Sequence, residues 1–451
     1  MRASTALLAA TLPLAASCAE PAHAVVPAPA TPAPTAITLQ SPAPHEAKPA
    51  GDRAVARALA AAIIARNLPS RGDFASRRVS RREMDRVVRE QVVHELPPDA
   101  LAYEEAQQKL LGVVDPREDY RELVLGMLGS QVAGLYVPRE KALYVVDDDR
   151  AGSTTDDEHT VLVHEIVHAI QDEHFDLGAR VRWREEGSDE IAAVHALGEG
   201  DATLAMLLEK SRGEAIPDAF FEGFATLMRD GNRQMVGDRV PRAVADALVD
   251  PYIEGLRFVR ERYAVGGWSA VDEAWRHPPS TTEQLLHAEK FTSREAPLPM
   301  SRDARGPKGF ALLTAGVVGE LDLRDWLSAF VDLAEARTLA SGWGQGRAEL
   351  FGDGPARAVR VRIRWDADAK THAARTAKRL VASFAERFGR GRAVGRFTCF
   401  DRPELGPFAV RAEGDGVVIL AGPAELGAKA QAAHGRCVDL TPWAAQAALA
   451  R

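Results

Sequence analysis

The pentapeptide at positions 164–168 reads His-Glu-Ile-Val-His, and it constrains the chain more than any other segment. Residues four positions apart share one face of an α-helix, so the imidazoles of His164 and His168 can converge on one metal ion with Glu165 beside them. Zinc held in this way lowers the pKa of a water molecule to about 7, and a neighbouring carboxylate can accept the proton. The motif predicts a helix that carries two zinc ligands and a general base.

The residues around the motif favour that helix. Thr155 is a suitable N-cap, and Glu158 follows three positions later, as in a capping box. Apolar residues recur at positions 163, 166, 167 and 170, which gives the helix one face to bury, and Gly178 is a suitable stop. An ordinary solvated helix face is the alternative interpretation, but the capped, one-sided pattern favours a metal site.

A catalytic zinc site needs a third protein ligand, and the chain offers several candidates. His174 completes a run close to HExxHxxGxxH, but Gln171 stands where that pattern has glycine, and a helix that continues there points His174 away. Glu199 lies on a second predicted helix, away from its apolar stripe. We favour Glu199 over His174, and His195 and Glu190 remain further alternatives.

The second helix is predicted from about residue 188 to 208. Gly198 and Gly200 flank Glu199 and would let two helix backbones approach closely. Asp201, two positions past Glu199, is a candidate to hold a ligating imidazole in one tautomer.

The segments VLVHEIVHAIQDEHFDL, ALGEGDATLAMLL and PPSTTEQLLHAEK give the chain a family resemblance. Between about residues 130 and 290 it resembles a group of bacterial secreted or lipoprotein-type HExxH proteins related to the gluzincin (peptidase MA-like) zinc metallopeptidases. The resemblance implies that His164, His168 and Glu199 bind Zn²⁺ and that Glu165 is the general base. From His287 the chain reads HAEK where HPEK is expected, which leaves the role of this histidine open.

The first 18 residues predict an export signal. Met1 and Arg2 precede an apolar segment that ends in small residues before Cys18 and is too short to span a membrane. LAASC resembles a lipoprotein cleavage site with its leucine one position early, so a lipid anchor at Cys18 and simple cleavage are both open. Residues 19–50, rich in alanine and proline, predict a disordered tether. We expect an exported protein, either lipid-anchored in the cell envelope or periplasmic or extracellular.

The rest of the chain has an ordinary globular composition, and the net charge of −8 gives no reason to expect a nucleic acid partner. We expect a mainly helical α+β fold with a zincin-like metallopeptidase domain at 51–350 and a small α+β unit at 351–451. Residues 51–112 are expected to be helical, and basic pairs such as Arg77-Arg78 to lie on a solvated helix face.

Two strands, at 132–136 and 142–146, are predicted directly before the motif. In zincins an edge strand above the cleft pairs with an extended substrate, and strand addition gives affinity without demanding a particular sequence. We expect this hairpin to have that role.

In the C-terminal unit, alternation over 358–365 predicts a strand with one buried face, while the glycine-rich segment 342–347 is expected to form a turn. Cys399 and Cys437 remain as an even pair once Cys18 is assigned to export, so we expect a disulfide. Two separate buried thiols are the alternative.

These features predict zinc-dependent hydrolysis of a peptide or protein substrate. The alternative is a zinc-stabilised surface or binding lipoprotein that cleaves nothing. Glu165 favours the enzyme, because a structural zinc site is closed by four protein ligands and has no use for a base. Hydrolysis of another carbonyl compound is a third possibility, because the same activated water attacks other carbonyl groups.

Overall fold

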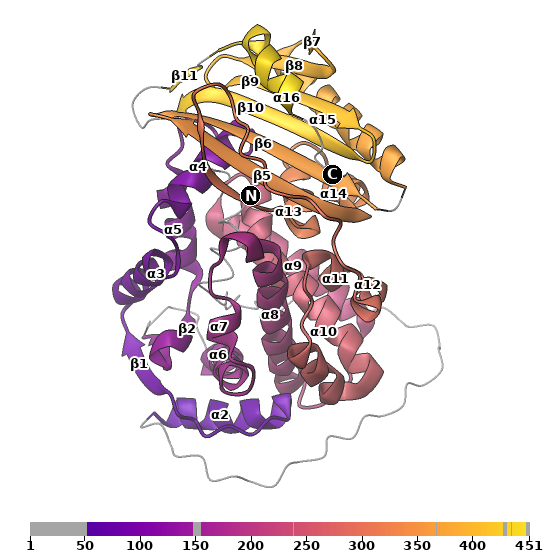
Figure 1. The fold of residues 1–451 in the computed structure, drawn as a ribbon. Coiled ribbons are helices and arrows are strands. Elements are labelled where there is room, and N and C mark those ends of the chain that lie inside the picture. Colours follow the sequence, from indigo (N-terminus) through magenta and orange to yellow (C-terminus); the bar gives the residue numbers. More distant parts are fainter. Residues whose placement is uncertain are drawn as a thin grey trace.

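A computed structural model describes residues 52–147, 155–237, 239–366, 368–426, 431–433 and 435–447. It shows a mainly helical α+β fold, which confirms the expected fold class at this level. Helices form one part of the molecule and a broad sheet forms the other (Figure 1). The expected signal segment at 1–18, with Cys18, and the expected tether at 19–50 lie outside the described residues.

The helical part contains a three-stranded sheet in the order β1-β3-β2, with β1 parallel and β2 antiparallel to β3. The predicted hairpin is confirmed as β2 and β3, and β2 is an edge strand. The elements of this part are α2 (Arg53–Arg66), β1 (Ala75–Val79), α3 (Arg81–Glu95), α4 (Ala100–Leu110), α5 (Tyr120–Gln131), β2 (Gly134–Val137), η1 (Pro138–Glu140), β3 (Ala142–Val146), α6 (Thr155–Phe175), α7 (Leu177–Arg180), η2 (Glu185–Gly187), α8 (Ser188–Lys210), α9 (Asp218–Val236), α10 (Arg242–Arg276), α11 (Thr282–Leu286) and α12 (Ala288–Ser293).

The helical interpretation of 51–112 is wrong at β1, which pairs with β3 along its whole length. The two arginines on this strand have partners that a solvated helix face would not provide. Arg77 forms an ion pair with Glu140, and Arg78 lies 2.7 Å from Asp52 and 2.6 Å from Glu158. These pairs tie β1 to η1 and to the first turns of α2 and α6.

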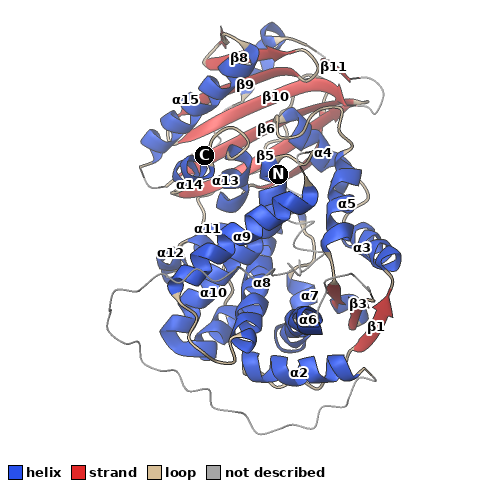
Figure 2. Ribbon diagram, turned by 180° about the vertical axis from the view of Figure 1, so that it is seen from behind, coloured by secondary structure: helices blue, strands red, loops and turns tan. Residues whose placement is uncertain are grey.

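Helix α8 is at the centre of the helical part, where it packs against α6 and α10, while α2 crosses both α6 and α8 (Figures 1 and 2). The approach to α10 is very close, since a Cβ on Gly200 would lie 2.1 Å from the carbonyl carbon of Gly255. By length and composition the segment Glu185–Lys210 could cross a membrane, but 89 % of its most apolar stretch is buried in the protein. This burial is that of a core helix.

The second part is an eight-stranded sheet in the order β4-β5-β6-β10-β9-β8-β7, with β11 paired to β10. Helix α15 covers one face (Figure 2), and η3 with α16 lies against the other. The predicted alternation along β6 is confirmed, with Val359, Val361, Ile363 and Trp365 in one apolar cluster with residues of α15. The expectation of a single buried face is wrong, because Arg360 and Arg362 on the opposite face are also buried, where Glu349 neutralises both. The elements are β4 (Ala311–Val317), α13 (Glu320–Leu327), α14 (Leu333–Ala340), β5 (Trp343–Asp353), β6 (Ala356–Trp365), α15 (Ala369–Phe388), β7 (Arg392–Val394), β8 (Phe397–Arg402), β9 (Gly406–Glu413), β10 (Gly416–Leu426), β11 (Gln431–Ala433), η3 (Cys437–Leu440) and α16 (Thr441–Gln446).

The predicted disulfide between Cys399 and Cys437 is confirmed, and it ties η3 to β8. The expected turn at 342–347 is wrong, because most of this segment is the start of β5. Gly346 is needed there, since a Cβ would lie 2.4 Å from the carbonyl oxygen of Val318. The expected domain division between residues 350 and 351 falls inside β5, and the sheet already begins at β4.

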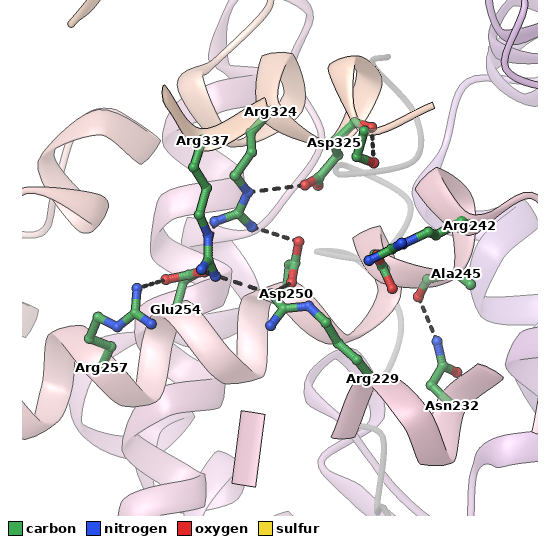
Figure 3. A network of polar contacts seen from close by, with 12 residues as sticks. Arg229, Asn232, Arg242, Ala245, Asp250, Glu254, Arg257, Arg324, Asp325 and Arg337 are labelled. Carbon is green, nitrogen blue, oxygen red and sulfur yellow. Dashed lines mark hydrogen bonds and ion pairs between the residues drawn. The ribbon is translucent and has the colours of Figure 1, made fainter. Parts of the chain in front are cut away.

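A buried network of charges joins the two parts (Figure 3). Arg324 of α13 lies 2.6 Å from Asp250 and 2.7 Å from Glu254, both on α10. Arg337 of α14 reaches Glu254, and Arg229 of α9 reaches Asp250. Arg324 and Arg337 thus connect α13 and α14 to α10, and they neutralise carboxylates that would be costly to leave buried and unpaired.

Candidate metal centre

Two helices bring the three favoured ligands together. His164 and His168 occupy successive turns on one face of α6, and Glu199 projects from α8, which packs beside it. One ligand atom from each residue lies within 4.8 Å of the other two. All three residues and Glu165 are buried, none more than 5 % exposed.

The spacing of the three ligand atoms fits a tetrahedral zinc ion. The two Nε2 atoms of His164 and His168 are 3.1 Å apart, and they lie 3.2 and 3.5 Å from Oε2 of Glu199. Ligands held about 2.1 Å from a tetrahedral ion lie roughly 3.4 Å from one another. The two-nitrogen, one-oxygen donor set is also one that zinc accepts in catalytic sites.

Gln171 fixes the orientation of His168. Its Nε2 donates to the backbone carbonyl of Gly198 at 2.9 Å, and its Oε1 lies 2.8 Å from Nδ1 of His168. Because a carbonyl can only accept, the amide NH₂ must face Gly198 and the amide oxygen must face the imidazole. Nδ1 of His168 therefore carries a proton whether the ring is charged or neutral, and in the neutral form that a metal ion requires the lone pair of Nε2 points to the other candidate ligands.

A third histidine contacts the second carboxylate oxygen of Glu199. Nε2 of His195, one turn earlier on α8, lies 3.0 Å from Oε1 of Glu199. Burial would raise the pKa of the Glu199 carboxyl, but the charge of His168 and hydrogen bonds from the surrounding histidines hold it well below its usual range. Burial would likewise lower the pKa of His168, yet attraction to Glu199 raises it to about 9. Burial lowers the pKa of His164, against its hydrogen bond to Glu199.

Glu165 lies beside the candidate metal ligands and contacts the edge strand β2. The backbone N–H of Tyr136 donates to its Oε2 at 2.9 Å, while its Oε1 is buried without a hydrogen-bond partner. Burial raises the pKa of this carboxyl to about 8, against the charge of His168. A cation bound by the neighbouring ligands would favour the ionised form and lower this pKa again. Gly134 allows the close packing, because a Cβ there would lie 2.9 Å from Glu165.

The other histidine and carboxylate candidates lie elsewhere. His174 is turned away and its Nε2 lies 2.6 Å from the carbonyl of Pro69, as a continuous helix through Gln171 predicts. Glu190 is on the surface and pairs with Arg184. Asp201 does not hold an imidazole. It accepts a hydrogen bond from Nε1 of Trp275 at 2.7 Å and lies 2.5 Å from Nε of Arg66.

His287 and a second group of three acidic residues have partners of their own. His287 pairs with Glu320 at 2.9 Å. A second group of carboxylates converges at Glu283, Glu295 and Asp366. Nζ of Lys290 lies 2.6 to 2.8 Å from all three, so this lysine already occupies the place of a metal ion.

Sequence reasoning missed the positioning roles of Gln171 and His195 and the ring of Tyr252, which stacks on His164. Spacing could have found two of them. Gln171 follows His168 by three positions, and His195 precedes Glu199 by four, which places each pair on one helix face. Tyr252 lies on α10, and no local pattern connects it to the motif. Comparisons with protein-family models, curated proteins and solved structures find no match.

Proposed function

We propose that this protein is a zinc-dependent peptidase with a zincin-like helical part and a gluzincin-type site. His164, His168 and Glu199 would hold the zinc, and Glu165 would be the general base. One observation carries the proposal: three ligand atoms at tetrahedral spacing stand beside a carboxylate with one oxygen free of partners. That combination suits hydrolysis, since a purely structural site needs no base.

Zinc, when bound, supplies a Lewis acid that polarises a carbonyl group and makes water more acidic. Proton transfer and substrate binding would be performed by residues of the chain. Oε1 of Glu165 is available to accept a proton, because the N–H of Tyr136 holds only Oε2. The same contact puts the edge strand β2 next to the base, which supports the predicted pairing of an extended substrate with this strand.

The second candidate is a zinc-stabilised protein that cleaves nothing. The near-complete burial of the ligands and of Glu165 favours it, because a catalytic site must admit a substrate. Under this alternative, the water that a peptidase activates would have no role.

We also propose that the protein is exported, in line with the signal-like first 18 residues. The disulfide between Cys399 and Cys437 supports this, because such bonds persist in oxidising compartments and are rare in the cytosol.

Zinc content per chain, measured together with cleavage of casein, tests the function in wild type and three variants. We expect about one zinc per chain and cleavage by wild type, zinc without cleavage for Glu165→Gln, and loss of both for Glu199→Gln. Glu190→Gln is the matched control, since Glu190 lies on the same helix but is 46 % exposed at its side chain and pairs with Arg184. Its zinc content and activity should equal those of wild type.

Three outcomes would count against the proposal. Full activity of Glu165→Gln would remove the assigned base. Full zinc content in Glu199→Gln would remove the assigned third ligand. Stoichiometric zinc with no cleavage by wild type would favour the non-catalytic alternative.

A further inference from the structure

The segment 368–396 is strongly basic in a chain that is acidic as a whole. It carries eight lysines and arginines against only Asp368 and Glu386, a net charge of +6, whereas the whole chain has −8 and the remainder therefore −14. No acidic residue occurs between positions 369 and 385. The segment includes α15, the edge strand β7 and the turns beside β7. Because a solvated surface normally mixes both signs of charge, this separation indicates an anionic partner.

The outer face of α15 carries three cations that have no partner in the described part of the chain. The opposite face of the helix bears small and apolar residues that pack on the sheet. Lys370, Arg375 and Lys378 are exposed, and none of them forms an ion pair or hydrogen bond with a described residue. The residues exposed between them are Thr371 and Ala374, which are uncharged. This face therefore offers positive charge without a carboxylate among it.

The positive charge continues beyond the end of α15. Arg390 and Arg396 flank β7, and both are exposed without an ion pair to a described residue. A Cβ on Gly389 or Gly395 would meet nothing within 4 Å, so the turns on both sides of β7 project into solvent. Phe388, the last residue of α15, is 40 % exposed beside them. Figure 1 shows β7 at the end of the sheet that is farthest from the helical part.

The other three cations of the segment are used within the protein. Arg379 and Arg392 pair with carboxylates, and Arg387 donates to a backbone carbonyl. Five cations and one exposed aromatic ring are left for a partner. Cations beside an aromatic ring are typical of protein surfaces that lie in the interface of a bilayer.

We propose that this basic face, formed by α15 and the turns beside β7, docks on the surface of an anionic lipid bilayer. The cations that contact the head groups are Lys370, Arg375, Lys378, Arg390 and Arg396, and Phe388 enters the interface beside them. The same surface repels the negative charge of the rest of the chain, which fixes the orientation of the protein. A soluble polyanion would match the cations but would leave Phe388 without a role. The proposal does not depend on zinc or on hydrolysis.

Sedimentation with vesicles tests the proposal on the full chain, which carries Cys18→Ser so that no lipid anchor is attached there. It should bind vesicles of phosphatidylcholine with about 30 % phosphatidylglycerol at least about tenfold more tightly than vesicles of phosphatidylcholine alone. The neutral vesicles also measure binding through the apolar residues before position 18. Raising NaCl from about 0.05 to about 0.5 M should remove the difference, because salt screens the charges.

Paired variants test the basic face itself. Arg375→Gln with Lys378→Gln should weaken binding to the anionic vesicles at least about tenfold, because each cation near such a surface contributes about fivefold. The matched control is Arg53→Gln with Arg57→Gln, which removes two exposed arginines of α2 that also have no ion pair with a described residue. Its affinity for the vesicles should stay within about threefold of the unsubstituted protein.

Phe388→Ser separates a lipid surface from other polyanions. It should weaken binding to the anionic vesicles about threefold or more and leave binding of soluble polyphosphate unchanged. Equal binding to anionic and neutral vesicles, or an equal loss in the two paired variants, would overturn the proposal. Tighter binding of polyphosphate than of vesicles, with no effect of Phe388→Ser, would also overturn it and would indicate a soluble polyanion instead.

Discussion

Replacing Gln171 by methionine tests the geometry of the candidate metal centre most directly. Methionine has a similar length but can neither accept from Nδ1 of His168 nor donate to the carbonyl of Gly198. His168 would then be free to rotate or to change tautomer, and the tie between α6 and α8 would be lost. We expect Gln171→Met to bind zinc more weakly while keeping the fold.

The magnitude follows from the two hydrogen bonds. Loss of a partner that orients a metal-ligating histidine weakens metal binding about 10- to 100-fold, which is roughly 1.4 to 2.8 kcal/mol. The assay is competition for zinc with a chromophoric chelator. Gln171→Glu should recover part of the affinity, because its carboxylate still accepts from His168 although it cannot donate to Gly198.

A matched control separates positioning from general destabilisation. Gln284 is also buried, accepts from the N–H of Ser280 and donates to the carbonyl of Glu295, far along the chain from the motif. Gln284→Met should lower Tm by a similar amount and leave zinc affinity unchanged. Zinc affinity of Gln171→Met within about twofold of wild type would refute the reasoning, whatever its Tm.

Three further predictions concern the scaffold. Arg324→Met removes one of the arginines that contact Asp250 and Glu254, while Arg229 still pairs with Asp250 and Arg337 with Glu254. It should cost about 1.5–3 kcal/mol in urea unfolding, whereas the exposed Arg86→Met should cost under about 1 kcal/mol, and equal effects would contradict the role of the network. Burial raises the pKa of Asp189 to about 7, so the contribution of this residue to stability is present below about pH 4 and is lost as the pH rises through 7. The Tm of Asp189→Asn minus that of wild type should therefore be larger at about pH 8.5 than at about pH 5. The same difference at both pH values would show that Asp189 ionises normally. Paired alanine substitution of Cys399 and Cys437, which are 38 positions apart, should lower unfolding free energy by about 4 kcal/mol, and an unchanged urea midpoint would contradict this.

Much of the candidate site is predictable because its signals are local. The spacing of His164 and His168 places them on one helix face. Glu199 lies off the apolar stripe of α8, which indicates that its carboxylate binds a polar or charged partner. Their convergence needs only that two adjacent helices pack together, which short connections favour. The roles of these residues as zinc ligands stay predictions until metal binding is measured.

The errors in the fold arise where partners distant in sequence decide the structure. The segment Ala75–Val79 carries two arginines and only one large apolar residue, so its own pattern does not suggest a strand. It becomes one because β3 offers backbone partners, and Glu140, Asp52 and Glu158 neutralise its charges. In β5, glycines that suggest a turn instead make room for Val318 and Leu298.

Gln171 disfavours one candidate metal site and supports another. As a helix former in place of glycine, it keeps α6 continuous, so His174 leaves the cluster and meets Pro69. The same continuity puts its amide one turn from His168 and opposite the backbone carbonyl of Gly198, to which it donates at 2.9 Å. The amide at position 171 and the carbonyl at position 198 are therefore a bonded pair between α6 and α8. Together they bring Glu199, the next residue on α8, to the ligand face of α6.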